Sequence, residues 1–190
     1  TTKRGVRPDN ILVRIGNVIR EYAKSQHYKS RDFKQIIHIT DTDGTFIPDE
    51  KVIDDINNEE VVYESDGIHT MNKQGIINRN KQKKANLIKL KSIEQVWNIP
   101  YRIYYMSCNL DHVLYNKRNS SDEEKEEKAY SFAKKYKNDV DGFIDYISNS
   151  DFSTDCTYEE SWNYIEEGMN SLERNTNLNI CINEELESRK

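Results

Sequence analysis

Apolar residues fall along the chain in two kinds of pattern, short continuous runs and segments with helical spacing. The run Ile36–Ile39 is rich in β-branched residues and predicts a strand that is buried on both faces. A second run at 101–107 predicts another strand, and the spacing of apolar residues between 78 and 97 predicts a long helix. Strand, helix and strand in this order indicate a right-handed parallel crossover. We therefore predict an α/β fold with a short, mostly parallel sheet and helices on both faces.

Most of the remaining segments predict helices. Helical spacing of apolar residues predicts a first helix that begins near Asp9. Two capping boxes, in which Ser or Thr precedes Glu by three residues, open helices at Ser121 and Thr157. A small hairpin is expected over residues 61–70, and the short apolar run 178–181 predicts an edge strand.

Length and composition indicate how the chain is organised. At 190 residues it is long enough for one core domain with a helical appendage. We expect an α/β core at 1–118 that lacks its first strand, and a helical C-terminal region at 119–190 packed on that core. The 3 cysteines lie far apart and are odd in number, which favours a reducing, cytoplasmic location. No stretch approaches the ~18 apolar residues that span a bilayer, so no membrane contact is expected.

The net charge of -5 conceals two segments of opposite sign. Residues 41–68 hold ten acids and one base, whereas residues 71–102 hold eight bases and one acid. A basic segment beside an acidic centre suits a metal-dependent enzyme that acts on phosphodiesters, although two solvated faces would look the same. The candidate nucleic-acid-binding residues are five lysines of the expected long helix: Lys81, Lys83, Lys84, Lys89 and Lys91.

The strongest chemical signal is a pair of carboxylates directly after the first predicted strand. Asp41 and Asp43 would project the same way if the strand continued through them. Two like charges at that spacing repel unless a cation or a shared proton relieves them. Parallel sheets place their chemistry beyond the carboxyl ends of their strands, which makes Asp41 and Asp43 candidate catalytic and metal-binding residues. The sequence Asp-Thr-Asp-Gly is also typical of turns, in which aspartates often have no catalytic or binding function.

The end of the second predicted strand offers three supporting residues. Ser107 ends that strand, and Asp111 and His112 lie in the helix expected to follow it. All three are positioned to support a site, and each also has an ordinary role as a helix-cap or helix-surface residue.

The strand ending in Asp41-Thr42-Asp43-Gly44 resembles the Asp-x-Asp strand of TOPRIM domains, the catalytic module of topoisomerases, primases and overcoming-lysogenization-defect nucleases. Within that group the chain looks most like the RloB and AbiLii type of prokaryotic phage-defence (abortive infection) proteins, over residues 10–118. The resemblance implies a TOPRIM-like core and a Mg²⁺-dependent (or Mn²⁺-dependent) nuclease, with Asp41 and Asp43 as the metal ligands. It also implies nucleic acid as a partner, together with a partner defence protein or self-association. No residue here matches the glutamate that ends the family's first strand and acts as acid/base.

The same residues, continued through Thr45 and Phe46, also resemble the first motif of haloacid-dehalogenase-type phosphatases. That resemblance implies Asp41 as a nucleophile, Asp43 as acid/base and Ser107 as the hydroxyl of the second motif. A third alternative is a non-catalytic interaction module, in which the pair serves only the turn.

Overall fold

The computed structural model describes residues 8–188, which divide into two compact units. The first unit holds the chain up to Thr40 together with Gln74–Tyr104, and the second holds Asp41–Lys73 together with the chain from Tyr105. The two units are separated by how residues pack, and neither unit begins or ends at residue 118. The expected boundary between an α/β core and a helical C-terminal region at residue 118 therefore stays a prediction.

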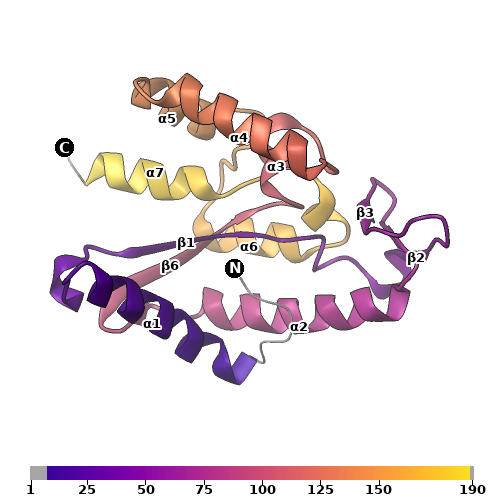
Figure 1. The fold of residues 1–190 in the computed structure, drawn as a ribbon, viewed down its shortest axis with the longest axis horizontal. Coiled ribbons are helices and arrows are strands. Elements are labelled where there is room, and N and C mark those ends of the chain that lie inside the picture. The colour runs from indigo at the N-terminus through magenta and orange to yellow at the C-terminus, as the bar shows by residue number, and fades with distance from the viewer. Residues whose placement is uncertain (1–7, 189–190) are drawn as a thin grey trace. The chain divides into compact units, whose positions relative to one another are not determined.

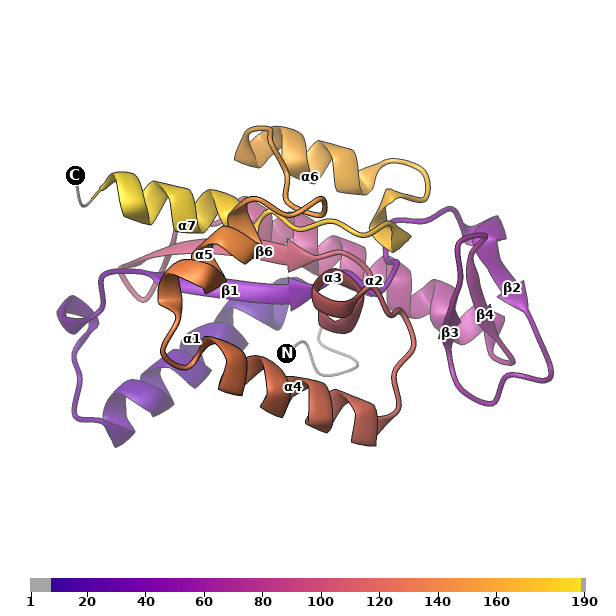
Figure 2. The ribbon, with the colours of Figure 1, turned by 90° about the horizontal axis from the view of Figure 1, so that it is seen from above.

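The first unit is a three-stranded sheet with two long helices. Its strands lie in the order β1-β6-β5, and β1 and β6 run side by side in the same direction (Figures 1 and 2). β5 pairs with β6 antiparallel. The elements, some of which reach into the second unit, are α1 (Pro8–Ser25), a 3-10 turn (Ser30–Asp32), β1 (Ile36–Asp41), α2 (Lys73–Lys91), β5 (Gln95–Val96) and β6 (Ile99–Met106).

The expectation that the first strand is buried on both faces is wrong. β1 is at the edge of its sheet, with β6 as its only neighbour among the described strands. Ile37 and Ile39 share one face of β1, and their side chains are 42% and 46% exposed. The fully enclosed strand is β6, in which Ile103 and Tyr104 are almost completely buried.

The long helix ends earlier than its apolar spacing predicts. α2 stops at Lys91, and Val96 pairs with Ile99 across a two-residue hairpin turn. Trp97 and Asn98 form that turn, and both adopt positive φ angles, 54° and 58°. Positive φ at both central residues suits the right-handed twist of a hairpin, which explains how the chain reverses here without a glycine.

The second unit joins a small sheet to a helical C-terminal region (Figure 2). β2 (Val52–Asp54) pairs parallel with β4 (Ile68–Thr70), which pairs antiparallel with β3 (Val62–Tyr63), so the expected hairpin is confirmed. A 3-10 turn, Asp49–Lys51, precedes β2. The helices are α3 (Leu110–Tyr115), α4 (Asp122–Tyr136), α5 (Val140–Ser148), α6 (Tyr158–Glu166) and α7 (Leu178–Glu187), with a 3-10 turn at Asn170–Leu172.

The fold class is α/β with a helical C-terminal part, as expected, but the sheet differs from the prediction. Instead of one mostly parallel sheet, the described residues contain two small mixed sheets of three strands each. The apolar run at 178–181 is the first turn of α7 and not an edge strand. Extended pairing ends just before it at Thr176, which bridges both Met106 and Ser153.

The core of the second unit forms around aromatic side chains. Tyr105 and Trp162 meet edge to face with ring centroids 5.2 Å apart, and both are fully buried. The Tyr105 hydroxyl donates to Asn175 Oδ1 at 2.7 Å, and the Tyr105 amide donates to Asn177 Oδ1 at 2.8 Å. These bonds hold the segment before α7 against β6. Within the described residues no helix is both long and apolar enough to cross a membrane.

Gly67 is a position where any side chain should disrupt the small sheet. A Cβ there would lie 2.1 Å from the backbone oxygen of Lys51, which leads into β2. Gly67→Ala should lower the free energy of unfolding by more than about 2 kcal/mol, because the backbone itself must move. Gly168→Ala is the control, since Gly168 also has positive φ but open space around it, and it should cost only about 1 kcal/mol. If urea denaturation shows that both variants lose the same free energy of unfolding, then the positive φ angle and not the clash with Lys51 destabilises Gly67→Ala.

Candidate functional site

Thr42 ties the end of β1 to the end of β6. Its amide donates to the Met106 carbonyl at 3.0 Å. Its hydroxyl accepts from the Cys108 amide at 2.8 Å and donates to the Ser171 carbonyl at 2.9 Å. Thr42 is fully buried, so these bonds form where water does not compete. The loop that carries the two candidate carboxylates is therefore held rigidly.

Asp41 and Asp43 flank this buried threonine. β1 ends at Asp41, and Asp43 has a left-handed backbone with φ of 51°. The alternation of a strand therefore does not extend to Asp43, and the expectation that both side chains project alike because they share a strand does not hold. The Asp43 amide donates to the Cys108 carbonyl at 2.7 Å, and both aspartates are half-buried. Gly44 continues the turn with φ of 62°. We call residues 41–44 the strand-end loop.

A segment from the far end of the chain supports the strand-end loop. The Phe46 amide donates to Ser171 Oγ at 3.3 Å, and a Cβ on Gly44 would lie 2.7 Å from Leu172 Cδ2. The Ser107 amide donates to the Asn175 carbonyl at 2.9 Å. Residues 170–175 thus contact both the strand-end loop and the turn after β6. Sequence reasoning missed this support, because it uses backbone carbonyls and small side chains that carry no motif.

Ser107 and its neighbours serve the turn that follows β6. Ser107 is fully buried, and its hydroxyl donates to the Asn170 carbonyl at 3.1 Å. Asn109 caps α3, since its Oδ1 accepts from the His112 amide at 2.9 Å. Its Nδ2 donates to the Arg118 carbonyl at 2.7 Å. These residues fix where α3 begins, and Asn109 was not among the predicted residues although Asn is a strong N-cap.

His112 and Asp111 lie in the first turn of α3. Burial, helped by the charges of Arg118 and Arg174, lowers the pKa of His112 from 6.5 to about 4. His112 is therefore neutral at pH 7 and is a poor proton donor there. Its Nδ1 and Asp111 Oδ2 are buried atoms that have no hydrogen-bond partner among the described residues. An unpaired buried carboxylate oxygen is costly, so Asp111 stays a candidate supporting residue.

The buried histidines predict an acid-sensitive fold. His112 and His38 both have a pKa lowered to about 4, chiefly by burial, so the unfolded chain binds more protons between pH 6.5 and 4. The free energy of unfolding should keep its full value above pH 6.5 and decrease between pH 6.5 and 4. The decrease should be up to about 1.4 kcal/mol per pH unit for each histidine. His112→Leu should reduce this slope, as measured by urea denaturation across the pH range.

The control for this experiment is His69→Gln. A hydrogen bond to Asp66 raises the pKa of His69, which is opposite in direction to the shift of His112. Its replacement should leave the slope between pH 6.5 and 4 unchanged. A slope that does not respond to His112→Leu would show that this histidine does not titrate on unfolding.

The five candidate lysines all lie on α2, in the first unit, whereas both carboxylates lie in the second. They do not share one face of the helix, because steps of 100° per residue spread them around most of its circumference. Their exposure differs accordingly. Lys81 and Lys84 are exposed, while Lys83, Lys89 and Lys91 are half-buried. The two exposed lysines are the better candidates for binding a phosphate backbone.

The donor set of the strand-end loop suits some metals and not others. Among the described residues no group of three or more His, Cys, Asp and Glu side chains could hold a metal ion. Structural Zn²⁺ takes four such protein ligands, and the strand-end loop does not provide them. Mg²⁺ is commonly held by one or two carboxylates, with water and substrate phosphates completing its shell. Asp41 and Asp43 fit that second pattern.

Comparisons of the chain with family models, with curated proteins and with solved structures each found no match. The assignment of a function therefore rests on the chemistry of the residues described above.

Proposed function

We propose that the protein is a Mg²⁺-dependent nuclease of the TOPRIM-like kind, acting on phosphodiester bonds in prokaryotic phage defence. The observation that carries this proposal is the strand-end loop. Asp41 and Asp43 stand on either side of a fully buried threonine whose hydroxyl bonds two other parts of the chain. Such anchoring holds the backbone of the two aspartates in place, and pre-organisation of this kind is what a catalytic metal site requires.

The charges of the loop support a cation there. Two half-buried aspartates lie two residues apart in the strand-end loop, and a divalent ion there would favour the charged form of both carboxylates. A bound Mg²⁺ would supply Lewis-acid polarisation of a phosphodiester oxygen. Asp41 and Asp43 would hold the ion, while the bonds of Thr42 would keep the backbone of both aspartates in place. No group of the described chain is assigned the acid/base role that the glutamate has in TOPRIM enzymes.

The phosphatase alternative is less well supported. It needs Ser107 as an accessible hydroxyl that contacts the transferred phosphate. In the structure Ser107 is fully buried, and its hydroxyl is bonded to the Asn170 carbonyl. Under that alternative Asp41 would be a nucleophile, and a phosphate-mimicking fluoride complex would add to it in the presence of Mg²⁺. Under the nuclease proposal no such adduct forms.

Nucleic-acid binding should depend on the exposed lysines of α2. The double variant Lys81→Glu, Lys84→Glu should weaken binding and lower the slope of log K against log salt by about 2, since each contact contributes roughly 0.9. Lys125→Glu, Lys134→Glu is the matched control, with two exposed lysines on the acidic helix α4. Fluorescence anisotropy with a labelled oligonucleotide measures both slopes. An equal change in the control would mean that only net charge matters.

The activity itself is tested with labelled single-stranded and duplex DNA and RNA. We expect cleavage with Mg²⁺ or Mn²⁺ and none in EDTA or with Ca²⁺ alone. Cleavage that continues in EDTA would contradict the proposal, because a phosphodiesterase built on two aspartates needs the cation to bind the phosphate.

A further inference from the structure

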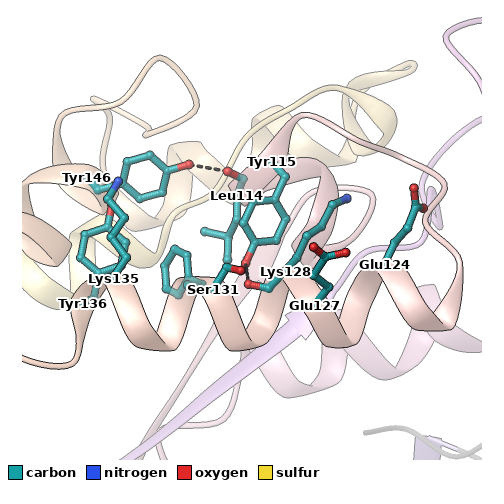
Figure 3. Close-up of a pocket in the computed structure, with 10 residues that line it drawn as sticks. Leu114, Tyr115, Glu124, Glu127, Lys128, Ser131, Lys135, Tyr136 and Tyr146 are labelled. Atoms are coloured by element: carbon teal, nitrogen blue, oxygen red, sulfur yellow. Dashed lines mark hydrogen bonds between the residues drawn. The ribbon is translucent and has the colours of Figure 1, made fainter.

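A pocket in the second unit lies between α3, α4 and α5, and none of its lining residues belongs to the strand-end loop (Figure 3). Its volume is about 500 Å³, within the range of small-molecule sites. Four aromatic rings line it: Tyr115, Phe132, Tyr136 and Tyr146. α4 contributes no buried residue, so its aromatic rings remain half-exposed at this opening. The exposed parts of these rings offer a flat apolar surface to a ligand.

Two of the four rings are held in place by their own hydroxyl groups. The Tyr115 hydroxyl donates to the Lys128 carbonyl at 3.1 Å, and the Tyr146 hydroxyl donates to the Leu114 carbonyl. Figure 3 shows the Tyr146 hydroxyl beside the Leu114 carbonyl, and Tyr115 reaching to the Lys128 carbonyl of α4. Because these bonds fix the ring positions, a planar ligand would lose little free energy in ordering the site.

Two lysines on α4 place positive charge on the same rings. Lys128 Nζ lies 5.2 Å from the centre of the Tyr115 ring. Lys135 Nζ lies 4.7 Å from the centre of Tyr136 and 5.5 Å from that of Tyr146. The two lysines are seven residues apart, or about 10.5 Å along the helix, so they face one side of α4. Lys128 Nζ also donates to Ser120 Oγ at 2.9 Å, whereas the flexible stem of Lys135 allows its ammonium to leave the ring face and meet an anion.

Figure 3 shows both acids that line the pocket, Glu124 and Glu127, at the Lys128 end and away from Lys135. Glu124 is paired with Lys117 and also caps the start of α4 by accepting from the Ser121 amide at 3.0 Å. Glu127 is the other acid among the lining residues, and its carboxylate could accept from an amino group of a purine base. An organic cation would be repelled, because Lys128 and Lys135 already place their ammonium groups over the ring faces on which such a cation would bind. The pocket therefore favours a ligand with a flat ring and a negative group.

From these contacts we infer that the pocket binds a nucleotide, whose base stacks on the tyrosine and phenylalanine rings and whose phosphate meets the Lys135 ammonium. Stacking of a base on an aromatic ring is sequence-tolerant, and a lysine acts as a point charge for phosphate. The nucleotide is either free or the end of a single strand. This site is independent of the proposed nuclease centre, and either could fail without the other.

The test is isothermal titration calorimetry at low salt with GMP, guanosine, inorganic phosphate and a short oligonucleotide that ends in guanosine 3′-phosphate. We expect GMP to bind, guanosine to bind about tenfold more weakly or worse, and phosphate alone to show no measurable binding. If the natural ligand is the end of a single strand, the oligonucleotide should bind at least as tightly as GMP. If the natural ligand is a free nucleotide, the oligonucleotide should bind more weakly than GMP. Either order supports the site.

Variants separate the pocket from general charge. Lys135→Gln should weaken GMP binding by about tenfold, and Phe132→Leu by roughly fivefold or more through lost stacking. Lys134→Gln is the control, because Lys134 neighbours Lys135 on α4 but does not line the pocket. Thermal unfolding of each variant checks that the helices still pack. The inference is overturned if GMP does not bind at millimolar concentration, if guanosine binds as tightly, if tetramethylammonium binds instead, or if Lys134→Gln loses as much affinity as Lys135→Gln.

Discussion

Asp41→Asn and Asp43→Asn should each reduce Mg²⁺-dependent cleavage by about a hundredfold or more. Each substitution keeps the size of the side chain and removes the negative charge that holds the cation. Metal stabilisation of a developing phosphate charge contributes several kcal/mol, and each 1.36 kcal/mol of barrier is a factor of ten in rate. The rate of cleavage at saturating substrate measures the loss.

Asp54→Asn is the matched control for these two variants. Asp54 also ends a strand, β2, and lies in the same acidic segment, but it is exposed. Its replacement should leave the cleavage rate within a factor of two or so of wild type, since an exposed surface charge contributes little. A large loss in Asp54→Asn would place the important carboxylates elsewhere in the acidic segment.

Thr42→Val should lower the free energy of unfolding by about 1–3 kcal/mol and should also impair metal binding. Valine has almost the same shape, so the change removes only the hydroxyl that joins Cys108 to Ser171. The buried Cys108 amide and Ser171 carbonyl then each lose a partner, although Cys108 also donates to Ser171 directly at 3.0 Å. Urea denaturation measures the stability of the variant.

Thr42→Ser separates the hydroxyl from the rest of the side chain. It keeps the hydroxyl and loses one buried methyl group, which costs about 1 kcal/mol. Metal binding should survive in Thr42→Ser and weaken in Thr42→Val, because the hydroxyl keeps both aspartates in register with β6. If the two variants bind metal equally well, the threonine serves stability alone.

Local signals in the sequence were sufficient to place most elements. The capping box at Ser121 forms as predicted, with the Glu124 amide donating to Ser121 Oγ and the Ser121 amide donating to Glu124 Oε2. Thr157 opens α6 in the same way. These signals depend on neighbouring residues only. The end of α2 was misplaced because Trp97 and Asn98 turn the chain without glycine or proline.

Properties that depend on distant parts of the chain were harder to predict. The burial of β1 depends on which strands lie beside it. A short apolar run predicts a strand but does not indicate whether that strand lies at the edge or in the middle of a sheet. The run Leu178–Cys181 was too short to distinguish a strand from the start of a helix. In the candidate site, the aspartates and the end of β6 were identified from their strands. Ser171 contacts Thr42 across 129 positions of sequence, and no local pattern reports such a contact.

Thermal unfolding with and without Mn²⁺ tests the central claim most directly, because it needs neither a substrate nor an acid/base group. The wild-type protein should be stabilised by Mn²⁺ through mass action, by about 2.7 kcal/mol when the ion is at a hundred times its Kd. Asp41→Asn and Asp43→Asn should lose this stabilisation, because each removes a charge that holds the ion. A wild-type protein that does not respond to millimolar Mn²⁺, or variants that respond as strongly as wild type, would contradict the proposal that Asp41 and Asp43 hold a catalytic metal.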